Sequence, residues 1–247
     1  MNRKSSGIRY LPGKHDLLVV SPHSPVIKGV FENDIRTGII AENIQQALDC
    51  HAIINDLFFK PKGPITKSFE NYFLDLYRID HSKKVHGYLS RIETIVNKGT
   101  KTTIVWIHGI TDDVAMAQGR EHTSLGLFHQ APDKLHALIG YGQGGDPKTG
   151  ETWSRYSARK ETVEALRNRL CAGGLTTILT HPAGSNYRGR DTKRLNQWFN
   201  QLGYGFDRVE SIHLEIREKG FRDTEANAVK TAKIITTALR FLTEGNR

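Results

Sequence analysis

The sequence predicts an α/β protein, a three-layer sandwich in which helices cover both faces of a mostly parallel, mixed sheet. Short apolar runs rich in β-branched residues recur along the chain between turn signals. Segments with a helical period separate these runs. The chain has 247 residues, 38% of them hydrophobic, which is enough for one large core. We therefore expect residues 1–247 to form a single domain.

Six apolar runs are the predicted strands. They begin with "DLLVVSPH" and end with "SIHLEIRE", and they occupy residues 16–23, 52–59, 102–109, 135–142, 175–182 and 211–218. Such near-continuous apolar runs are typical of strands that are buried on both faces of a sheet.

Helical periods occupy several of the intervening segments. Residues 82–98 and 191–202 each place their apolar side chains on one face. A helix is expected over 157–173, with Ser157 as its N-cap and Gly173 as its stop, and a closing helix over 224–243.

Two further segments show no such period. Residues 59–72 and 109–135 are therefore expected to be functional or ordering loops.

The composition limits the function classes. The formal net charge of +9 fits a nucleic-acid partner, an anionic small substrate or simply a basic surface, but the basic residues are scattered. No apolar run approaches a membrane span and the basic start lacks an apolar signal region, so we expect a cytoplasmic protein without a membrane partner. Cys50 and Cys171 have no framework spacing and are interpreted as reduced structural thiols.

Polar residues stand at the ends of several predicted strands. His23, His108 and His181 each end an apolar run, and Glu215 lies near the end of another. In open α/β sheets the ligand crevice lies beyond the carboxyl ends of the strands. Residues far apart in the sequence are thus expected to meet at one edge of the sheet.

These residue types fit a catalytic zinc, which takes three protein ligands from His and carboxylate. His23 and His108 are the predicted histidine ligands, and the acid is Asp34 or Glu32. Asp34 is preferred because "DIRTGIIAENI" resembles a helix start placed beside the strand that carries His23. The alternatives are an ordinary helix N-cap for Asp34 and a hydrogen-bonded, non-ligating His23.

Glu215 is the predicted acid/base, because a carboxylate between two core residues is costly to bury unless it is paired or functional. Its alternative is an ion pair with Arg217. Arg78 could bind a substrate carboxylate, or could pair with Asp75 or Asp80.

The "RGR" stretch, which includes Arg188, could open the helix over 191–202 and supply another anion contact, or form a solvated basic face.

Two other chemistries are disfavoured. The "GYGQGG" stretch at 140–145 is followed by turn residues rather than the helix that a phosphate loop needs. The GxSxG elbow of serine hydrolases is absent from the sequence. A non-enzymatic nucleic-acid-binding protein remains the alternative from another class, and steep salt dependence of binding would identify it.

At these residues the sequence resembles the N-formylglutamate amidohydrolase family, whose fold is related to zinc carboxypeptidases and poly-γ-glutamate hydrolases. The resemblance rests on an ordered set of short strings: "SPHS", "DIRTGIIAENI", "FLDLYRI", "WIHG" and "IHLEIRE". It implies one zinc ion held by His23, Asp34 and His108, Glu215 as catalytic acid/base and Arg78 as the anchor of a small acidic N-acyl amino acid or short peptide.

The sequence departs from the family pattern in three ways, one of which is a loose spacing from His23 to the acid that allows Glu32 in place of Asp34. The residues after His23 are Ser and Pro where the family has a glycine nearby, and Tyr77 stands where the pattern Asp-Leu-Asn-Arg has its Asn. The loss of this Asn removes a polar contact. A γ-glutamyl or carboxypeptidase-type metallopeptidase is therefore an alternative to a formylglutamate hydrolase.

Overall fold

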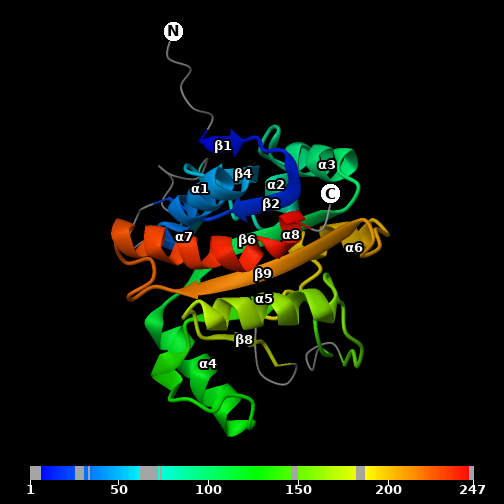
Figure 1. Cartoon of the computed structure of the whole chain (residues 1–247). Helices are drawn as coiled ribbons and strands as arrows, with labels where there is room; N and C mark the ends of the chain where they lie inside the picture. Colours follow the sequence, from blue (N-terminus) through cyan, green and yellow to red (C-terminus); the bar gives the residue numbers. More distant parts are fainter. Residues whose placement is uncertain are drawn as a thin grey trace.

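The computed structural model describes residues 7–25, 31–32, 34–61, 72, 74–145, 150–181 and 187–244. A seven-stranded sheet with the order β1-β4-β2-β6-β9-β7-β8 runs through it (Figure 1). Its strands are β1 (Ile8–Leu11), β2 (His15–Ser21), β4 (Cys50–Asn55), β6 (Thr102–Ile110), β7 (Ala137–Gly140), β8 (Thr177–Leu179) and β9 (Val209–Arg217). Two short strands, β3 (Phe31–Glu32) and β5 (Lys60–Pro61), form a separate antiparallel pair.

The large sheet is mixed and mostly parallel, as predicted. The parallel pairs are β2 with β4, β2 with β6, β6 with β9 and β7 with β8. The antiparallel pairs are β1 with β4 and β7 with β9. All six predicted strands are present. The edge strand β1 was not predicted, because its four residues are all half-buried and show no alternation.

The helices lie between the strands in the sequence. They are α1 (Thr37–Leu48), α2 (Ile79–Ser82), α3 (Tyr88–Lys98), α4 (Asp112–Ser124), α5 (Lys160–Ala172), α6 (Trp198–Gln201), α7 (Glu225–Leu239) and α8 (Phe241–Glu244). Two 3-10 helices are η2 (Pro132–Lys134) and η3 (Leu195–Gln197).

Two large apolar cores, one on each face of the sheet, make the predicted three layers, and a third, smaller cluster includes Ala115 of α4. Along β2, Leu17 and Val19 point into the core beneath α1, α5 and α7, whereas Leu18 and Val20 point into the core beneath α3 and α6. This alternation follows from the two-residue period of a strand. In Figure 1, α7 and α5 cross in front of the sheet. The α/β sandwich is thus confirmed.

The prediction of a loop over 109–135 is wrong, because α4 and η2 occupy much of it. The residues that α4 buries are Ala115, Gly119 and His122 rather than large apolar side chains. A Cβ atom on Gly119 would lie 2.6 Å from the carbonyl oxygen of Pro132, so the helix approaches the backbone of η2 closely. Small and polar contact residues therefore hide this helix from a search for apolar periods. The other predicted loop, 59–72, falls largely outside the described residues.

Three helix boundaries differ from the prediction. The N-cap of α5 is Arg159 rather than Ser157, whose hydroxyl donates instead to the carbonyl of Ser211 at 2.6 Å. Helix α3 begins at Tyr88 rather than at residue 82, since Gly87 before it adopts a left-handed φ of 79°. The helix predicted over 191–202 is limited to η3 and α6, so the "RGR" stretch does not open it. The stop at Gly173 is confirmed.

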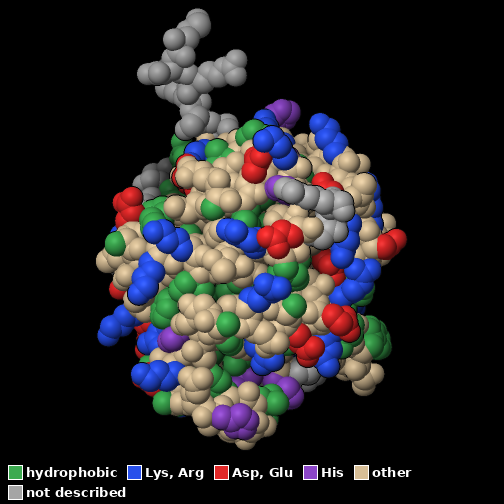
Figure 2. Space-filling model, viewed as in Figure 1, with side chains coloured by type: hydrophobic (Ala, Val, Ile, Leu, Met, Phe, Trp, Pro, Cys, Tyr) green, Lys and Arg blue, Asp and Glu red, His purple; other side chains and the backbone are tan. Residues whose placement is uncertain are grey.

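Two surface properties bear on possible partners. Among the described residues, no helix is long and apolar enough to cross a bilayer. On the face drawn in Figure 2, Lys and Arg side chains are spread among acidic ones rather than gathered in a single patch.

Candidate metal centre

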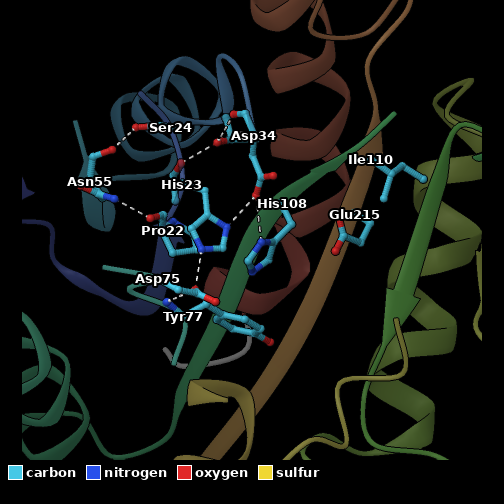
Figure 3. A network of polar contacts seen from close by, with 12 residues as sticks. Pro22, His23, Ser24, Asp34, Asn55, Asp75, Tyr77, His108, Ile110 and Glu215 are labelled. Carbon is cyan, nitrogen blue, oxygen red and sulfur yellow. Dashed lines mark hydrogen bonds and ion pairs between the residues drawn. The ribbon is translucent and has the colours of Figure 1, made fainter. Parts of the chain in front are cut away.

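Three buried side chains converge where β2 and β6 end. His23 follows β2, Asp34 precedes α1 and His108 lies near the end of β6. The Nδ1 atoms of His23 and His108 lie 3.2 Å and 2.9 Å from Oδ2 of Asp34. One ligand atom from each residue can be chosen so that all three lie within 4.8 Å of one another. The structure thus brings together the predicted residues His23, Asp34 and His108 (Figure 3).

A short backbone bridge returns Asp34 to His23. The backbone N–H of Asp34 donates to the carbonyl of His23 at 2.9 Å. Arg36, the N-cap of α1, adopts a left-handed φ of 64° and donates through its guanidinium to the carbonyl of Asp223 at 2.7 Å. At Gly38 a Cβ atom would lie 2.9 Å from the side chain of Ser24, so only glycine lets α1 approach the His23 turn this closely.

The alternative assignment of Asp34 as an ordinary N-cap is wrong. Arg36 holds the cap position of α1, and no side chain caps that end of the helix. The carboxylate of Asp34 instead faces the two imidazoles. Glu32, the alternative ligand, belongs to β3, and its side chain lies outside the described residues.

Asp75 is a site residue that the sequence did not reveal. Its Oδ1 lies 2.7 Å from Nε2 of His23, on the opposite side of the ring from Asp34. Its Oδ2 accepts from the guanidinium of Arg194 at 2.5 Å. The stretch "LDLYR" contains Asp75, but the sequence offered only Arg78 as its partner. A carboxylate that orients an imidazole is a common outer partner at metal sites.

The charges of the three residues are interdependent. Burial disfavours a charged His23, but the carboxylates of Asp75 and Asp34 outweigh burial and raise its pKa to about 9. Burial likewise opposes ionisation of Asp34, yet hydrogen bonds from His108 and His23 hold the pKa of this carboxyl well below its usual range. Burial and the neighbouring His213 lower the pKa of His108 to about 4. The site therefore contains a carboxylate and a neutral imidazole near neutral pH.

Glu215 lies beside this group on β9, directly opposite His108 in the parallel register of β6 and β9. Only 5% of the residue is exposed. Its Oε1 lies 2.7 Å from Nε2 of His213, while Oε2 has no hydrogen-bond partner among the described residues. The alternative ion pair with Arg217 is not formed, because Arg217 donates to Asp112 at 2.6 Å. One carboxylate oxygen is thus left open in a buried polar site.

Arg222 ties together the segments that carry these residues. Its buried guanidinium donates to three backbone carbonyls, at 2.9 Å, 3.1 Å and 3.0 Å, which belong to Ile216, Ile35 and Ile110. These residues follow Glu215, Asp34 and His108 by one or two positions. Gly109 leaves room for this arrangement, since a Cβ there would lie 2.2 Å from the guanidinium carbon.

The two predicted anion-binding arginines have other partners in the structure. Arg78 makes two 3.0 Å hydrogen bonds to the carboxylate of Asp80, its alternative partner in the sequence. Arg188 donates to the carbonyl of Gly145 at 2.6 Å. His181, the other histidine at a strand end, follows the edge strand β8, and its backbone N–H donates to His122 at 3.0 Å.

The ligand types fit a divalent transition metal. Two imidazoles and one carboxylate, buried and within reach of one ion, are a common ligand set of catalytic zinc. An adjacent carboxylate with an open oxygen is placed to exchange protons with water or a substrate.

Solved structures with similar folds were found by comparison. An N-formylglutamate amidohydrolase from Ralstonia eutropha JMP134 has a TM-score of 0.59 at 13% sequence identity, covering 97% of this chain and 98% of that one. A gene product of Agrobacterium tumefaciens has a TM-score of 0.58 at 14% identity, covering 97% and 95%. A bacteriophage poly-gamma-glutamate hydrolase has a TM-score of 0.50 at 13% identity, covering 96% and 87%.

A metallo-carboxypeptidase from Burkholderia cenocepacia is also similar, with a TM-score of 0.51 at 10% identity, covering 97% of this chain and 61% of that one. No protein-family model and no curated protein sequence matches the chain. The chain therefore has the fold of N-formylglutamate amidohydrolase and the carboxypeptidase-like proteins. The resemblance found in the sequence is confirmed at the level of the fold.

Proposed function

We propose that this protein is a metal-dependent hydrolase that cleaves an amide bond in a small acidic substrate, either an N-acyl amino acid or a short peptide. One observation carries the proposal: the buried His23, Asp34 and His108 lie next to a buried glutamate, Glu215, that has an open oxygen. The similarity of the fold to an amidohydrolase, a poly-gamma-glutamate hydrolase and a metallo-carboxypeptidase supports it.

One zinc ion is the proposed cofactor, with His23, Asp34 and His108 as its protein ligands. Imidazole and carboxylate are ligands that zinc accepts, and three of them leave a position for water or substrate. Asp75 would hold the ring of His23 in its ligating orientation by the hydrogen bond to Nε2. When bound, zinc supplies Lewis acidity, which polarises an amide carbonyl and makes water more acidic.

Glu215 is the proposed acid/base. Its open Oε2 would accept a proton from the attacking water and later deliver that proton to the leaving nitrogen. Its place opposite His108 in the register of β6 and β9 brings the carboxylate and a ligand into one site.

Arg78 remains the proposed anchor of the substrate carboxylate, and Arg188 a proposed second anion contact. Arg78 is matched to a carboxylate by its planar guanidinium. Its present partner, Asp80, has a side chain that is 55% exposed, so a substrate carboxylate could replace it at little cost.

Metal content tests the ligand set. We would measure zinc per chain by elemental analysis in the wild type and in His23→Ala and His108→Ala, with His181→Ala as the matched control from the end of β8. About one zinc per chain in the wild type and the control, and loss in both ligand variants, is expected. Undiminished zinc in the ligand variants, or a wild type that takes up no zinc when it is supplied, would rule out the proposed centre.

Activity tests the substrate class. N-formyl-L-glutamate, other N-acyl acidic amino acids and γ-glutamyl peptides would be assayed with the zinc-loaded protein. Release of the free amino acid, lost in Glu215→Gln, is the expected result. Salt-sensitive binding of nucleic acid without any hydrolysis would favour the non-enzymatic alternative.

A further inference from the structure

Tyr77, His213 and Glu215 form a continuous row of hydrogen bonds beside the proposed metal ligands. The Tyr77 hydroxyl lies 2.7 Å from Nδ1 of His213, and Nε2 of His213 lies 2.7 Å from Oε1 of Glu215. All three residues are buried, with exposed fractions of 4%, 6% and 5%. The row ends at Glu215, whose Oε2 has no partner among the described residues.

The chemistry of the three groups determines which atom donates and which accepts in each hydrogen bond of the row. A carboxylate can only accept hydrogen bonds, and a neutral imidazole donates from one nitrogen and accepts at the other. For an ionised Glu215 and a neutral His213, Nε2 donates to Glu215, which leaves Nδ1 to accept from the hydroxyl of Tyr77. In that state both links in the row are satisfied when the hydrogen of His213 is on Nε2.

The surrounding packing fixes the row in place. The two-residue period of β9 puts His213 and Glu215 on the same face of the sheet. The ring of His213 stacks on His108 with centroids 4.5 Å apart, and the ring of Tyr77 meets His108 edge-on at 4.3 Å. Tyr77 is thus held against both His213 and the proposed ligand His108. Figure 3 shows Tyr77 beside His108.

The same short segment supports both halves of the site. Asp75 accepts from the backbone N–H of Tyr77 at 3.1 Å while its Oδ1 also contacts His23. Two residues further on, the side chain of Tyr77 contacts His213. The segment therefore reaches a proposed ligand through Asp75 and the proposed acid/base through Tyr77.

We infer that Tyr77, acting through His213, is a positioning residue for Glu215: the row fixes Oε1 and so makes Oε2 the oxygen that exchanges protons with the substrate. This inference rests on the proposed function and deepens it. It also gives a role to Tyr77, which stands where the family that the sequence resembles has an Asn. The phenol orients Glu215 through His213 and does not contact the substrate.

The proton arrangement can be tested without any turnover. In the zinc-supplied protein with ¹⁵N-labelled histidine, NMR distinguishes a protonated ring nitrogen from an unprotonated one, and His213→Gln identifies the signals of His213. We expect the hydrogen on Nε2 in the wild type. In Tyr77→Phe the Nδ1 signal should shift toward that of a nitrogen that accepts no hydrogen bond. A wild-type hydrogen on Nδ1 would overturn the inference.

Kinetics on the best substrate found for the wild type test the positioning role. Tyr77→Phe should lower kcat about tenfold and leave KM within about twofold, because Tyr77 does not touch the substrate. Tyr10→Phe is the matched control, since Tyr10 forms the same kind of bond to Nδ1 of His51, at 3.1 Å, between β1 and β4. Zinc per chain is measured in each variant, so that loss of metal is not mistaken for loss of positioning.

A pair of substitutions at His213 separates its hydrogen bond from its bulk. Gln carries an amide N–H that can replace Nε2–H, so His213→Gln should keep kcat within about tenfold of the wild type, whereas His213→Leu should lose about 100-fold. Equal losses in the two variants would contradict a role for the hydrogen bond.

The possible failures are distinguishable. Turnover that requires Glu215 but is unchanged in Tyr77→Phe would overturn the inference and leave the proposed function standing. If the wild type turns over none of the substrates, the proposed function fails, and the NMR result alone decides the orientation of the row.

Discussion

The two ends of β9 each bury a glutamate, and they treat it differently. At the amino end, Oε1 of Glu210 accepts from the backbone N–H of Arg159 at 2.9 Å and from the hydroxyl of Thr162 at 3.0 Å, and Oε2 lies 3.0 Å from the ammonium of Lys101. At the carboxyl end, Glu215 has a single imidazole partner, at Oε1, and among the described residues its Oε2 has neither a hydrogen-bond partner nor an ion pair.

The difference separates the carboxylate proposed to act in catalysis from one that only joins parts of the fold. Burial of an ionised group is costly in both places. At Glu210 two cations, Lys101 and Arg159, and two hydrogen-bond donors offset that cost, so the residue serves to join the start of α5 to the sheet. At Glu215 the cost is only partly offset, which is typical of groups retained for their chemistry. The partners of a buried acid, rather than its burial, distinguish the two.

The largest expected effect is on catalysis. Glu215→Gln keeps the shape of the side chain but cannot take up a proton, so kcat should fall at least about 1,000-fold with zinc content unchanged. Glu210→Gln is the matched control on the same strand and should keep kcat within about twofold. The measurement is steady-state hydrolysis of the best substrate, and equal effects of the two substitutions would remove the distinction between the ends of β9.

Asp75 extends the comparison to a carboxylate that contacts both a cation, Arg194, and a proposed metal ligand, His23. Asp75→Asn weakens the hold on the His23 ring, so zinc affinity should fall about 10- to 100-fold. Asp80→Asn, at an exposed ion pair with Arg78, should leave zinc affinity unchanged. Competition with a chelator of known affinity measures both variants. An unaltered zinc affinity in Asp75→Asn would contradict the proposed role of Asp75 in orienting His23.

The free energy of unfolding should depend more on Glu210 than on Glu215, which is the reverse of the order expected for kcat. Glu210→Gln leaves two donors and Lys101 without their charged partner, and should reduce the free energy of unfolding by about 2 kcal/mol, a value lowered for the partial exposure of Lys101. Glu215→Gln removes a poorly compensated charge and should cost less than about 1 kcal/mol. Urea denaturation of the metal-free proteins tests this order, which a larger loss in Glu215→Gln would contradict.

The smallest effect concerns protons released at the metal centre. Without metal, the pKa of His23 is about 9, so this ring is protonated at pH 7.5, whereas Asp34 is ionised and His108, with a pKa of about 4, is neutral. A ligand must be deprotonated, so zinc binding should release about one proton, and affinity should rise with pH until about pH 9. Calorimetry in buffers of different ionisation enthalpy counts this proton. Binding heats that do not depend on the buffer would show that His23 is already neutral.

Much of the site could be predicted because it depends on local patterns. The apolar runs located the strands, and the rule for the carboxyl ends of parallel strands placed His23 and His108 near each other. Asp34 was found because the start of α1 follows β2 closely in the sequence. Glu215 stood out as an acid among apolar neighbours.

The residues that were missed act through contacts between distant segments. Asp75 and Tyr77 reach His23 and His213 across 52 and 136 positions of the chain, and no local period records such a contact. Arg222 likewise binds backbone carbonyls. Every residue has a backbone carbonyl, so the sequence does not show which ones Arg222 binds. Helix α4 was missed for another reason, since its small contact residues give no apolar stripe.

The position of β9 has a consequence for how the protein is made. Among the described residues it is the last strand in the sequence, yet it lies in the interior of the sheet between β6 and β7. Until β9 has been synthesised, the place between β6 and β7 is empty. Each of these two strands then has one edge without a hydrogen-bonded neighbour. Glu215 and the guanidinium of Arg222 are synthesised only after the other described strands of the sheet. A nascent chain that stalls before this point therefore has exposed strand edges and lacks Glu215, which makes it prone to pair with other chains.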